Sequence, residues 1–177
     1  LVERLLARGD TVTVIDDLST GSLENLAAVA RHPRLSVVQS RVSECADLGQ
    51  LVKETDSIFH LAAAVGVKTI MDNPVETLDI NVKGTEVVLR LANRFKKKVF
   101  ITSTSEIYGN HMEHTLSEDD NRLMGSVKKR RWAYACSKTL DEFLALAYFD
   151  EKKLPVVMSR LGVYVPFNMR TPRVSSV

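Results

Sequence analysis

Tyr134 and Lys138 combine residue types and a spacing that can move a proton. They are four residues apart, so in a helix their side chains share one face. A lysine ammonium beside a phenol favours phenolate, which predicts a lowered pKa for Tyr134. Such a phenolate can take a proton from a sugar hydroxyl while a hydride leaves the same carbon for a nicotinamide. The alternative is an ordinary helical tyrosine, and Tyr148 and Lys152 repeat the spacing further along the same helix.

A run of hydroxyl side chains and one acid precedes this pair in the chain, from Thr102 through Ser103, Thr104 and Ser105 to Glu106. The run follows directly on a buried, β-rich segment. Its side chains are therefore expected at the carboxyl edge of a parallel sheet, where ligands bind in open α/β folds. A hydroxyl there could orient the substrate oxygen that the tyrosine deprotonates.

Asp16 ends a β-branched run and is followed by Asp17. In a dinucleotide-binding fold, an acid at this place accepts hydrogen bonds from the adenosine ribose and repels a 2′-phosphate, which predicts NAD. The alternative is a turn aspartate. The fingerprint places glycines about 20 residues before the acid, whereas Asp16 is only the sixteenth residue. We therefore expect a first strand and a glycine loop upstream of Leu1.

Helical and strand patterns alternate along the chain. We predict helices at 1–8, 22–30, 48–55, 75–95 and 131–149, and strands at 11–15, 35–38, 57–60, 99–102 and 155–159. Short strands separated by helices predict parallel βαβ units with helices on both faces of the sheet. The expected fold is α/β, a doubly wound Rossmann-like parallel sheet, truncated at the first strand and lacking most of a substrate domain.

The last predicted helix carries an apolar face that excludes the residues able to do chemistry. This face is expected to consist of Trp132, Cys136, Leu140, Phe143 and Ala147. Tyr134, Lys138 and Asp141 then point elsewhere. That separation favours the functional interpretation of the Tyr–Lys pair.

Composition narrows the class of protein further. Lys plus Arg is 24 and Asp plus Glu is 22, so a net charge of +2 suggests no nucleic-acid partner. The apolar runs are shorter than the roughly 20 residues of a membrane span. Cys45 and Cys136 are expected as free thiols in a cytoplasmic protein. His111 and His114 are spaced like metal ligands but have no third ligand nearby, so no metal site is expected.

Five motifs occur in a recognisable order. They are Asp16-Asp17-Leu18-Ser19-Thr20-Gly21, His60-Leu61-Ala62-Ala63, Asn81-Val82-Lys83-Gly84-Thr85, Ser103-Thr104-Ser105-Glu106-Ile107-Tyr108-Gly109 and Tyr134-x-x-x-Lys138. Over about residues 1–159 the chain resembles the extended short-chain dehydrogenase/reductases, the NAD-dependent epimerase/dehydratase family acting on nucleotide sugars. The resemblance implies an NAD-binding domain at 1–160, incomplete at its N-terminus, and an atypical C-terminal remnant at 161–177.

The resemblance also implies roles for individual residues. Those that would contact NAD are Asp16 and Asp17 at the adenosine ribose, Leu61, Ala62 and Ala63 along the pyrophosphate path, Asn81 as a support, and Lys138 at the nicotinamide ribose. Those that would serve the substrate are Tyr134, Lys138, Thr104 and Glu106 in catalysis, with Ser103 and Ser105 in binding. The implied partners are a nucleotide-sugar substrate and a second copy of the chain, joined through the helices at 75–95 and 131–149.

The implied reaction begins with oxidation at sugar C4 to a 4-keto intermediate. Ser105-Glu106 looks most like the UDP-glucuronate decarboxylases of this family, with a plain 4-epimerase as an alternative. A redox enzyme acting on a non-sugar carbonyl and an inactive NAD-binding fragment remain further alternatives. Arg160 is followed by Leu161, where the family carries a segment with a substrate-contacting Asn. The chain of residues 1–177 is therefore expected to be inactive by itself.

Overall fold

The structure is a computed structural model and describes residues 1–110 and 116–162. Its helices are α1 (Val2–Arg8), α2 (Leu48–Glu54), α3 (Val67–Asp72), α4 (Pro74–Phe95) and α5 (Trp132–Lys152), with short 3-10 helices η1 (Leu23–Val29), η2 (Val42–Glu44) and η3 (Ser105–Tyr108). Its strands are β1 (Val12–Asp16), β2 (Leu35–Gln39), β3 (Ser57–His60), β4 (Lys98–Thr104) and β5 (Val156–Leu161). His111, His114 and residues 163–177 of the expected C-terminal remnant lie outside the described residues.

Every strand pairing in the described residues is parallel. β1 pairs with β2, and β3, β4 and β5 form a second sheet in that order. In the described part of the chain no backbone pairing joins β1 to β3. The strands β1, β3 and β4 end at Asp16, His60 and Thr104. Because parallel strands end at a common edge, each of these residues lies at the carboxyl edge of its sheet. The predicted parallel α/β fold is confirmed.

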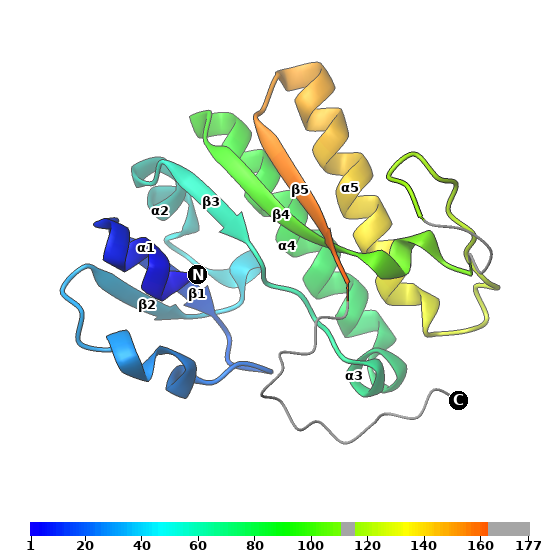
Figure 1. The fold of residues 1–177 in the computed structure, drawn as a ribbon, viewed down its shortest axis with the longest axis horizontal. Coiled ribbons are helices and arrows are strands. Elements are labelled where there is room, and N and C mark those ends of the chain that lie inside the picture. The colour runs from blue at the N-terminus through cyan, green and yellow to red at the C-terminus, as the bar shows by residue number, and fades with distance from the viewer. Residues whose placement is uncertain (111–115, 163–177) are drawn as a thin grey trace.

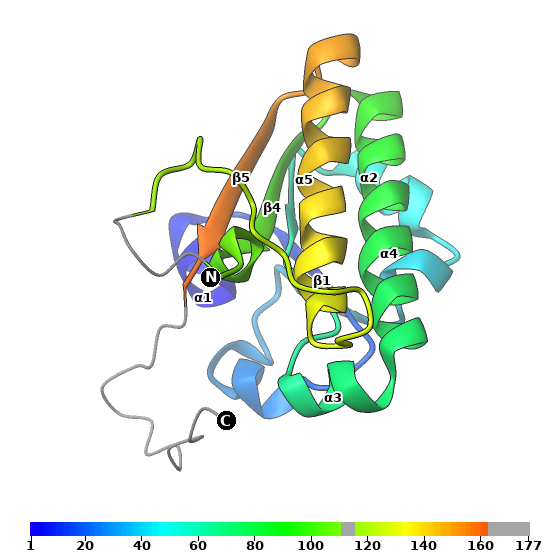
Figure 2. The same ribbon diagram turned by 90° about the vertical axis from the view of Figure 1, so that its right-hand side faces the viewer.

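The helices α2, α4 and α5 lie together on one side of the sheets, and α1 lies on the other side (Figure 2). Helices on both faces were expected, but the second face of the β3–β4–β5 sheet is only thinly covered in the described residues. Phe59 is 42% exposed there and Val157 is 61% exposed. None of the helices in the part that the structure describes is both long and apolar enough to cross a membrane.

The main core lies between α4, α5 and the second sheet. α4 begins with Pro74, which is favourable at a helix start, and ends where Lys96 adopts the left-handed conformation. Leu89, Ala92 and Ala145 are completely buried in this core. The helices α4 and α5 run side by side behind the strands (Figure 1). Small residues at this contact let the two helices approach closely, which fixes α5 relative to the carboxyl ends of the strands.

The predicted elements are largely confirmed. One segment differs in type, and short helices appear that the sequence did not predict. The segment predicted as a helix at 22–30 forms a 3-10 helix, capped by the Ser22 hydroxyl that accepts from the Glu24 backbone amide at 3.2 Å. Its seven residues have no buried side chain to hold a regular α-helix. The helix α3 is not predicted from the sequence, because its six residues are too few for a clear period.

The predicted separation of the α5 faces is confirmed for Lys138 and Asp141, while much of the apolar face is exposed to solvent. Leu140 is 48% exposed and Phe143 is 61% exposed, whereas Lys138 and Asp141 are each 1% exposed. The inward side of α5 packs against polar side chains of α4. Polar groups that pair with each other, such as Asn81 and Ser137, are therefore buried at this contact. Apolar periodicity predicts which residues share a face, but the neighbouring element decides which face is covered.

Candidate active site

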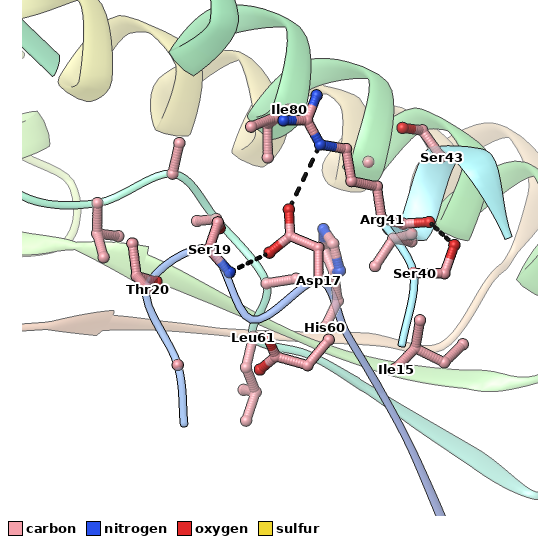
Figure 3. Close-up of a pocket in the computed structure, with 18 residues that line it drawn as sticks. Ile15, Asp17, Ser19, Thr20, Ser40, Arg41, Ser43, His60, Leu61 and Ile80 are labelled. Carbon is pink, nitrogen blue, oxygen red and sulfur yellow. Dashed lines mark hydrogen bonds and ion pairs between the residues drawn. The ribbon is translucent and has the colours of Figure 1, made fainter. Parts of the chain in front are cut away.

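A pocket lies at the carboxyl ends of β1, β2 and β3 and against α4 (Figure 3). Five residues expected to contact a cofactor line it, namely Asp16, Asp17, Leu61, Ala62 and Ala63. They come from two segments more than 40 residues apart in the chain. The parallel sheets therefore bring these two motifs, which the resemblance assigned to one cofactor, to one cavity.

Asp16 is held at the start of the turn that follows β1. Its Oδ1 accepts a hydrogen bond from the Leu18 backbone amide at 2.8 Å. A Cβ added to Gly21 would lie 3.1 Å from Oδ2, so glycine leaves room beside this oxygen. No cation pairs with Asp16 among the described residues. Its carboxylate can therefore accept hydrogen bonds from a ligand.

Asp17 is engaged differently from its neighbour. Its Oδ1 accepts from the Ser19 amide at 2.9 Å, and its Oδ2 lies 3.4 Å from Arg41 Nε (Figure 3). Hydrogen bonds from Ser19, together with the Arg41 charge, hold the pKa of Asp17 below its ordinary value. Arg41 also pairs with Glu76 at the start of α4, which raises the pKa of its guanidinium.

The sequence analysis did not assign Arg41 to the site. The signal was its position directly after the strand β2, at the same edge as the carboxyl end of β1. The structure adds that Arg41 ties the turn after β1 to the first turn of α4. This link orders one wall of the pocket.

Asn81 connects the end of β3 to the first turn of α5. Its Oδ1 accepts from the Ala64 amide at 2.7 Å, and its Nδ2 donates to Ser137 Oγ at 3.0 Å. Ser137 Oγ in turn donates to the Tyr134 carbonyl at 2.8 Å. Asn81 therefore supports the helical turn that carries Tyr134, and Ser137 is a member of the site that sequence reasoning missed.

The Tyr–Lys pair sits on α5 outside the pocket of Figure 3. The pKa of Tyr134 is raised because burial and the charges of Glu106 and Asp141 disfavour phenolate. The prediction of a lowered Tyr134 pKa is therefore wrong for this arrangement. Its physical reason is that Lys138 Nζ pairs with Asp141 Oδ2 at 3.5 Å, and that burial lowers the pKa of Lys138 itself.

The predicted hydroxyl run continues from β4 into η3. Thr104 Oγ1 accepts from the Glu106 amide at 3.2 Å, which caps η3 and fixes the turn. Ser103 Oγ is buried beside the Glu142 carboxylate and helps to lower the pKa of that group. Ser105 is partly buried and Glu106 is exposed. The effect of Glu106 on the Tyr134 pKa indicates that the acid faces the start of α5.

A buried carboxylate on α5 binds two arginines. Glu142 Oε1 lies 3.0 Å from Arg160 Nε, and its Oε2 accepts from Arg160 Nη2 and Arg122 Nη2, each at 2.9 Å. Arg160 also donates to Tyr108 Oη at 2.9 Å. Burial alone would raise the pKa of Glu142, but the arginines hold it below its ordinary value. This arginine clamp joins α5, β5 and η3, and the sequence analysis did not foresee it.

Comparison with known proteins gives the family. The family described as GDP-mannose 4,6 dehydratase matches residues 1–175. The chain belongs to this family. It is 38% identical over 98% of its length to a UDP-N-acetyl-alpha-D-glucosaminuronate decarboxylase of Bacillus cytotoxicus, and 35% identical over 98% to UDP-glucuronic acid decarboxylase 1 of Arabidopsis thaliana. It spans 51% and 37% of those two relatives.

Solved structures agree with this assignment. DesIV, a dTDP-glucose 4,6-dehydratase of Streptomyces venezuelae solved with NAD, superposes with a TM-score of 0.80 at 29% identity, over 90% of this chain and 50% of that one. A UDP-N-acetylglucosamine 4-epimerase of Methanobrevibacter ruminantium superposes with a TM-score of 0.76 at 28% identity, over 85% of this chain and 46% of that one. The predicted family and the Rossmann-like fold are confirmed.

Proposed function

We propose that this protein modifies a nucleotide sugar with NAD through a 4-keto intermediate, and that it belongs to the decarboxylase-like members of its family. The observation that carries the proposal is the joint position of two motifs. The acids after β1 and the segment after β3 line one pocket, and Asn81 links that segment to the helical turn of Tyr134.

The residues present fit NAD. The Asp16 carboxylate, which has no cation partner in the described residues, can accept hydrogen bonds from ribose hydroxyls. Leu61, Ala62 and Ala63 supply an apolar wall of the same pocket. Asp17 would order the turn and Lys138 would bind the second ribose. When bound, NAD supplies the acceptor for the hydride that leaves the sugar. DesIV, which shares the fold, was solved with this cofactor.

The chain's own residues would handle the proton and the sugar. Tyr134 Oη would remove the hydroxyl proton at C4, and its raised pKa means that a positive charge or a hydrogen bond must assist it in the complex. Thr104 would assist Tyr134. Glu106 would act beside Tyr134, with Ser103 and Ser105 contacting the substrate. A keto group at C4 can accept the electron pair of the C5–C6 bond, so a uronate sugar would lose C6 as carbon dioxide and leave an enolate. A proton added at C5 would then restore the 4-keto sugar.

The decarboxylase-like subtype is supported by Ser105-Glu106 and by the similarity to two decarboxylases. A plain 4-epimerase is the second candidate, supported by the structural similarity to a 4-epimerase. An NAD-binding chain without catalysis is the third, because residues 1–177 span about half of the first relative. We assign 1–160 to an NAD-binding domain and 161–177 to an atypical C-terminal remnant.

We further propose a cytoplasmic homodimer. Exposed apolar side chains on the two long helices support the dimer. These side chains are Val75, Leu78, Leu140, Phe143 and Phe149. The helices α4 and α5 lie side by side on the outside of the sheets (Figure 2). Cys45 and Cys136 are free thiols, which fits a reducing compartment. Among the described residues β1 and β3 each pair with a single strand, which supports the expected further parallel strand beside them.

The full-length protein incubated with UDP-glucuronate, UDP-glucose and dTDP-glucose tests the proposal. We expect decarboxylation of UDP-glucuronate, detected by mass spectrometry of the product. Tyr134→Phe should reduce turnover by about 10²- to 10⁴-fold. Tyr148→Phe, which repeats the same spacing to a lysine, is the matched control and should leave turnover unchanged. Turnover of UDP-glucose alone would favour the epimerase, and binding of NAD without turnover would favour the third candidate.

A further inference from the structure

An ion pair is buried inside the candidate active site. The side chains of Lys138 and Asp141 are each 2% exposed, and Lys138 Nζ lies 3.5 Å from Asp141 Oδ2. Asp141 is the acid that pairs with Lys138 within residues 1–110 and 116–162, and its carboxylate also accepts a hydrogen bond from Thr85. The ammonium therefore depends on one carboxylate for its compensation. A charge in this situation is retained only while its counter-charge is present.

The groups that surround the pair come from three elements. On α4, Thr85 is completely buried, and its Oγ1 lies 3.1 Å from His60 Nε2 of β3. Burial and the Lys138 charge lower the pKa of His60 to about 3, so this imidazole is neutral near pH 7. On α5, Tyr134 has a raised pKa and is neutral as well.

Glu142 is the remaining acid of this part of α5. Its carboxylate is bound by Arg160 and Arg122 and is not available as a counter-charge for the lysine. Glu106 faces the tyrosine from η3 and is exposed to solvent. Among the described groups near Lys138, Asp141 is thus the one that supplies a buried negative charge.

We propose that Asp141 is a positioning residue for Lys138: its buried carboxylate keeps the lysine protonated and fixes its ammonium on the inward face of α5. Asp141 touches neither of the atoms that would react and acts through the lysine. For its consequence in catalysis, the inference rests on the proposed function, in which Lys138 serves the cofactor ribose and assists Tyr134.

The pH dependence follows from the two charges. Burial raises the pKa of Asp141 to about 6, against the opposing effects of Lys138 and Thr85. Both members are therefore charged well above pH 6, and Asp141 takes up a proton as the pH falls through about 6. At the alkaline end, loss of the proton from Lys138 ends the pairing. Removal of the Asp141 charge should move this alkaline limit to lower pH, because burial then acts on the lysine without opposition.

The first experiment measures the charge on the lysine without cofactor or substrate. The full-length protein is labelled with ¹³C and ¹⁵N at lysine, and the Lys138 signal is assigned by its loss in Lys138→Met. In Asp141→Asn, the titration midpoint of Lys138 should fall by about one pH unit or more. Asp79→Asn removes the acid of an exposed pair with Lys83 on α4 and is the matched control. An unchanged or raised Lys138 midpoint in Asp141→Asn overturns the inference.

A second experiment covers the case in which Asp141→Asn does not fold. The double variant Lys138→Met/Asp141→Leu removes both charges and should recover stability relative to Lys138→Met and Asp141→Leu alone. A double variant no more stable than either single variant contradicts the pairing.

Binding of NAD across the pH range then tests the link to the proposed function. In Asp141→Asn, the alkaline loss of NAD affinity should move to lower pH, while Asp79→Asn should keep the wild-type profile. If the Lys138 midpoint falls but NAD does not bind even to the wild type, the positioning role stands and the proposed function fails. If NAD binds and its pH profile is the same in Asp141→Asn, the role of Asp141 in cofactor binding is refuted.

Discussion

At the scale of single residues, two adjacent aspartates have different tasks. Asp16 anchors its own turn with one oxygen and has no cation partner in the described residues, whereas Asp17 pairs with Arg41 at 3.4 Å. A free carboxylate can accept hydrogen bonds from ribose hydroxyls, but a carboxylate held by an arginine mainly orders protein. Substitution of each aspartate in turn should therefore distinguish the role of Asp16 from that of Asp17 in NAD binding.

Asp16→Asn should weaken NAD binding by about 10- to 100-fold, because hydrogen bonds to a charged acceptor are lost. Asp17→Asn is the matched variant and should weaken it much less, since it loosens only the contact to Arg41. Isothermal titration of the full-length protein with NAD measures both. Equal losses in the two variants would show that both carboxylates contact the cofactor.

His60 should make stability depend on pH. Its pKa is about 3 in the folded protein, against an ordinary value of 6.5. The unfolded chain therefore binds a proton more readily, and the stabilisation present above pH 6.5 is lost as the pH falls toward 3. The pKa of Asp141 is raised from 3.8 to about 6. Its contribution to the free energy of unfolding therefore decreases as the pH rises between these two values, which is opposite to the effect of His60.

Urea denaturation at several pH values checks this expectation. The free energy of unfolding of the wild type should fall more steeply between pH 6.5 and 4 than that of His60→Gln, whose side chain does not titrate. The His60 contribution amounts to up to about 5 kcal/mol. His32→Gln, which replaces a partly buried histidine in the turn before β2, is the matched control. Parallel curves for the wild type and His60→Gln would refute the assignment.

At the scale of elements, α5 is positioned by polar contacts as well as by its core. Ala145 packs in the apolar core, while Glu142 binds arginines from β5 and from the segment before α5. Ser137 adds the link to Asn81 of α4. The helix that carries the Tyr–Lys pair is therefore fixed on several sides.

Glu142→Gln should destabilise the protein by about 3–5 kcal/mol, because it leaves two arginines without their buried counter-charge. Glu151→Gln on the same helix, where the side chain is 69% exposed, should change stability by less than about 0.5 kcal/mol. Chemical denaturation of both variants at neutral pH measures the difference. A loss below 1 kcal/mol in Glu142→Gln would indicate that the clamp is energetically minor.

At the scale of the whole molecule, the described residues form two parallel sheets with most helices on one side. The inner sides of α4 and α5 pack in the main core. Their outer sides carry several exposed apolar side chains. A surface of this kind is typical of an interface between protein molecules. The surface therefore supports the proposed dimer at these helices.

Phe143→Glu should convert a dimer of the full-length protein into monomers, because a charge would be buried at the centre of the proposed interface. Sedimentation or light scattering measures the mass, and circular dichroism verifies that the variant is folded. Phe59→Glu places the same charge on the exposed face of β3 and should leave the oligomeric state unchanged. A wild type that is monomeric at all concentrations would refute the dimer directly.

The amino-acid sequence by itself determined the alternation of strands and helices, the parallel sheet and the family. These depend on local periodicity and on motifs whose residues are close together in the chain. The family resemblance assigned Asp16 and Leu61–Ala63 to one cofactor, and the structure places both segments at one pocket.

The tertiary structure alone decided which groups balance each other's charge. Lys138 and Asp141 are a buried pair, Arg41 binds Asp17 and Glu76, and the predicted apolar face of α5 points outward. A charge is tolerated in the interior only where a partner from another turn or element meets it. Such partners lie at sequence separations that no local pattern encodes, and so the electrostatics of the site emerge only from the folded chain.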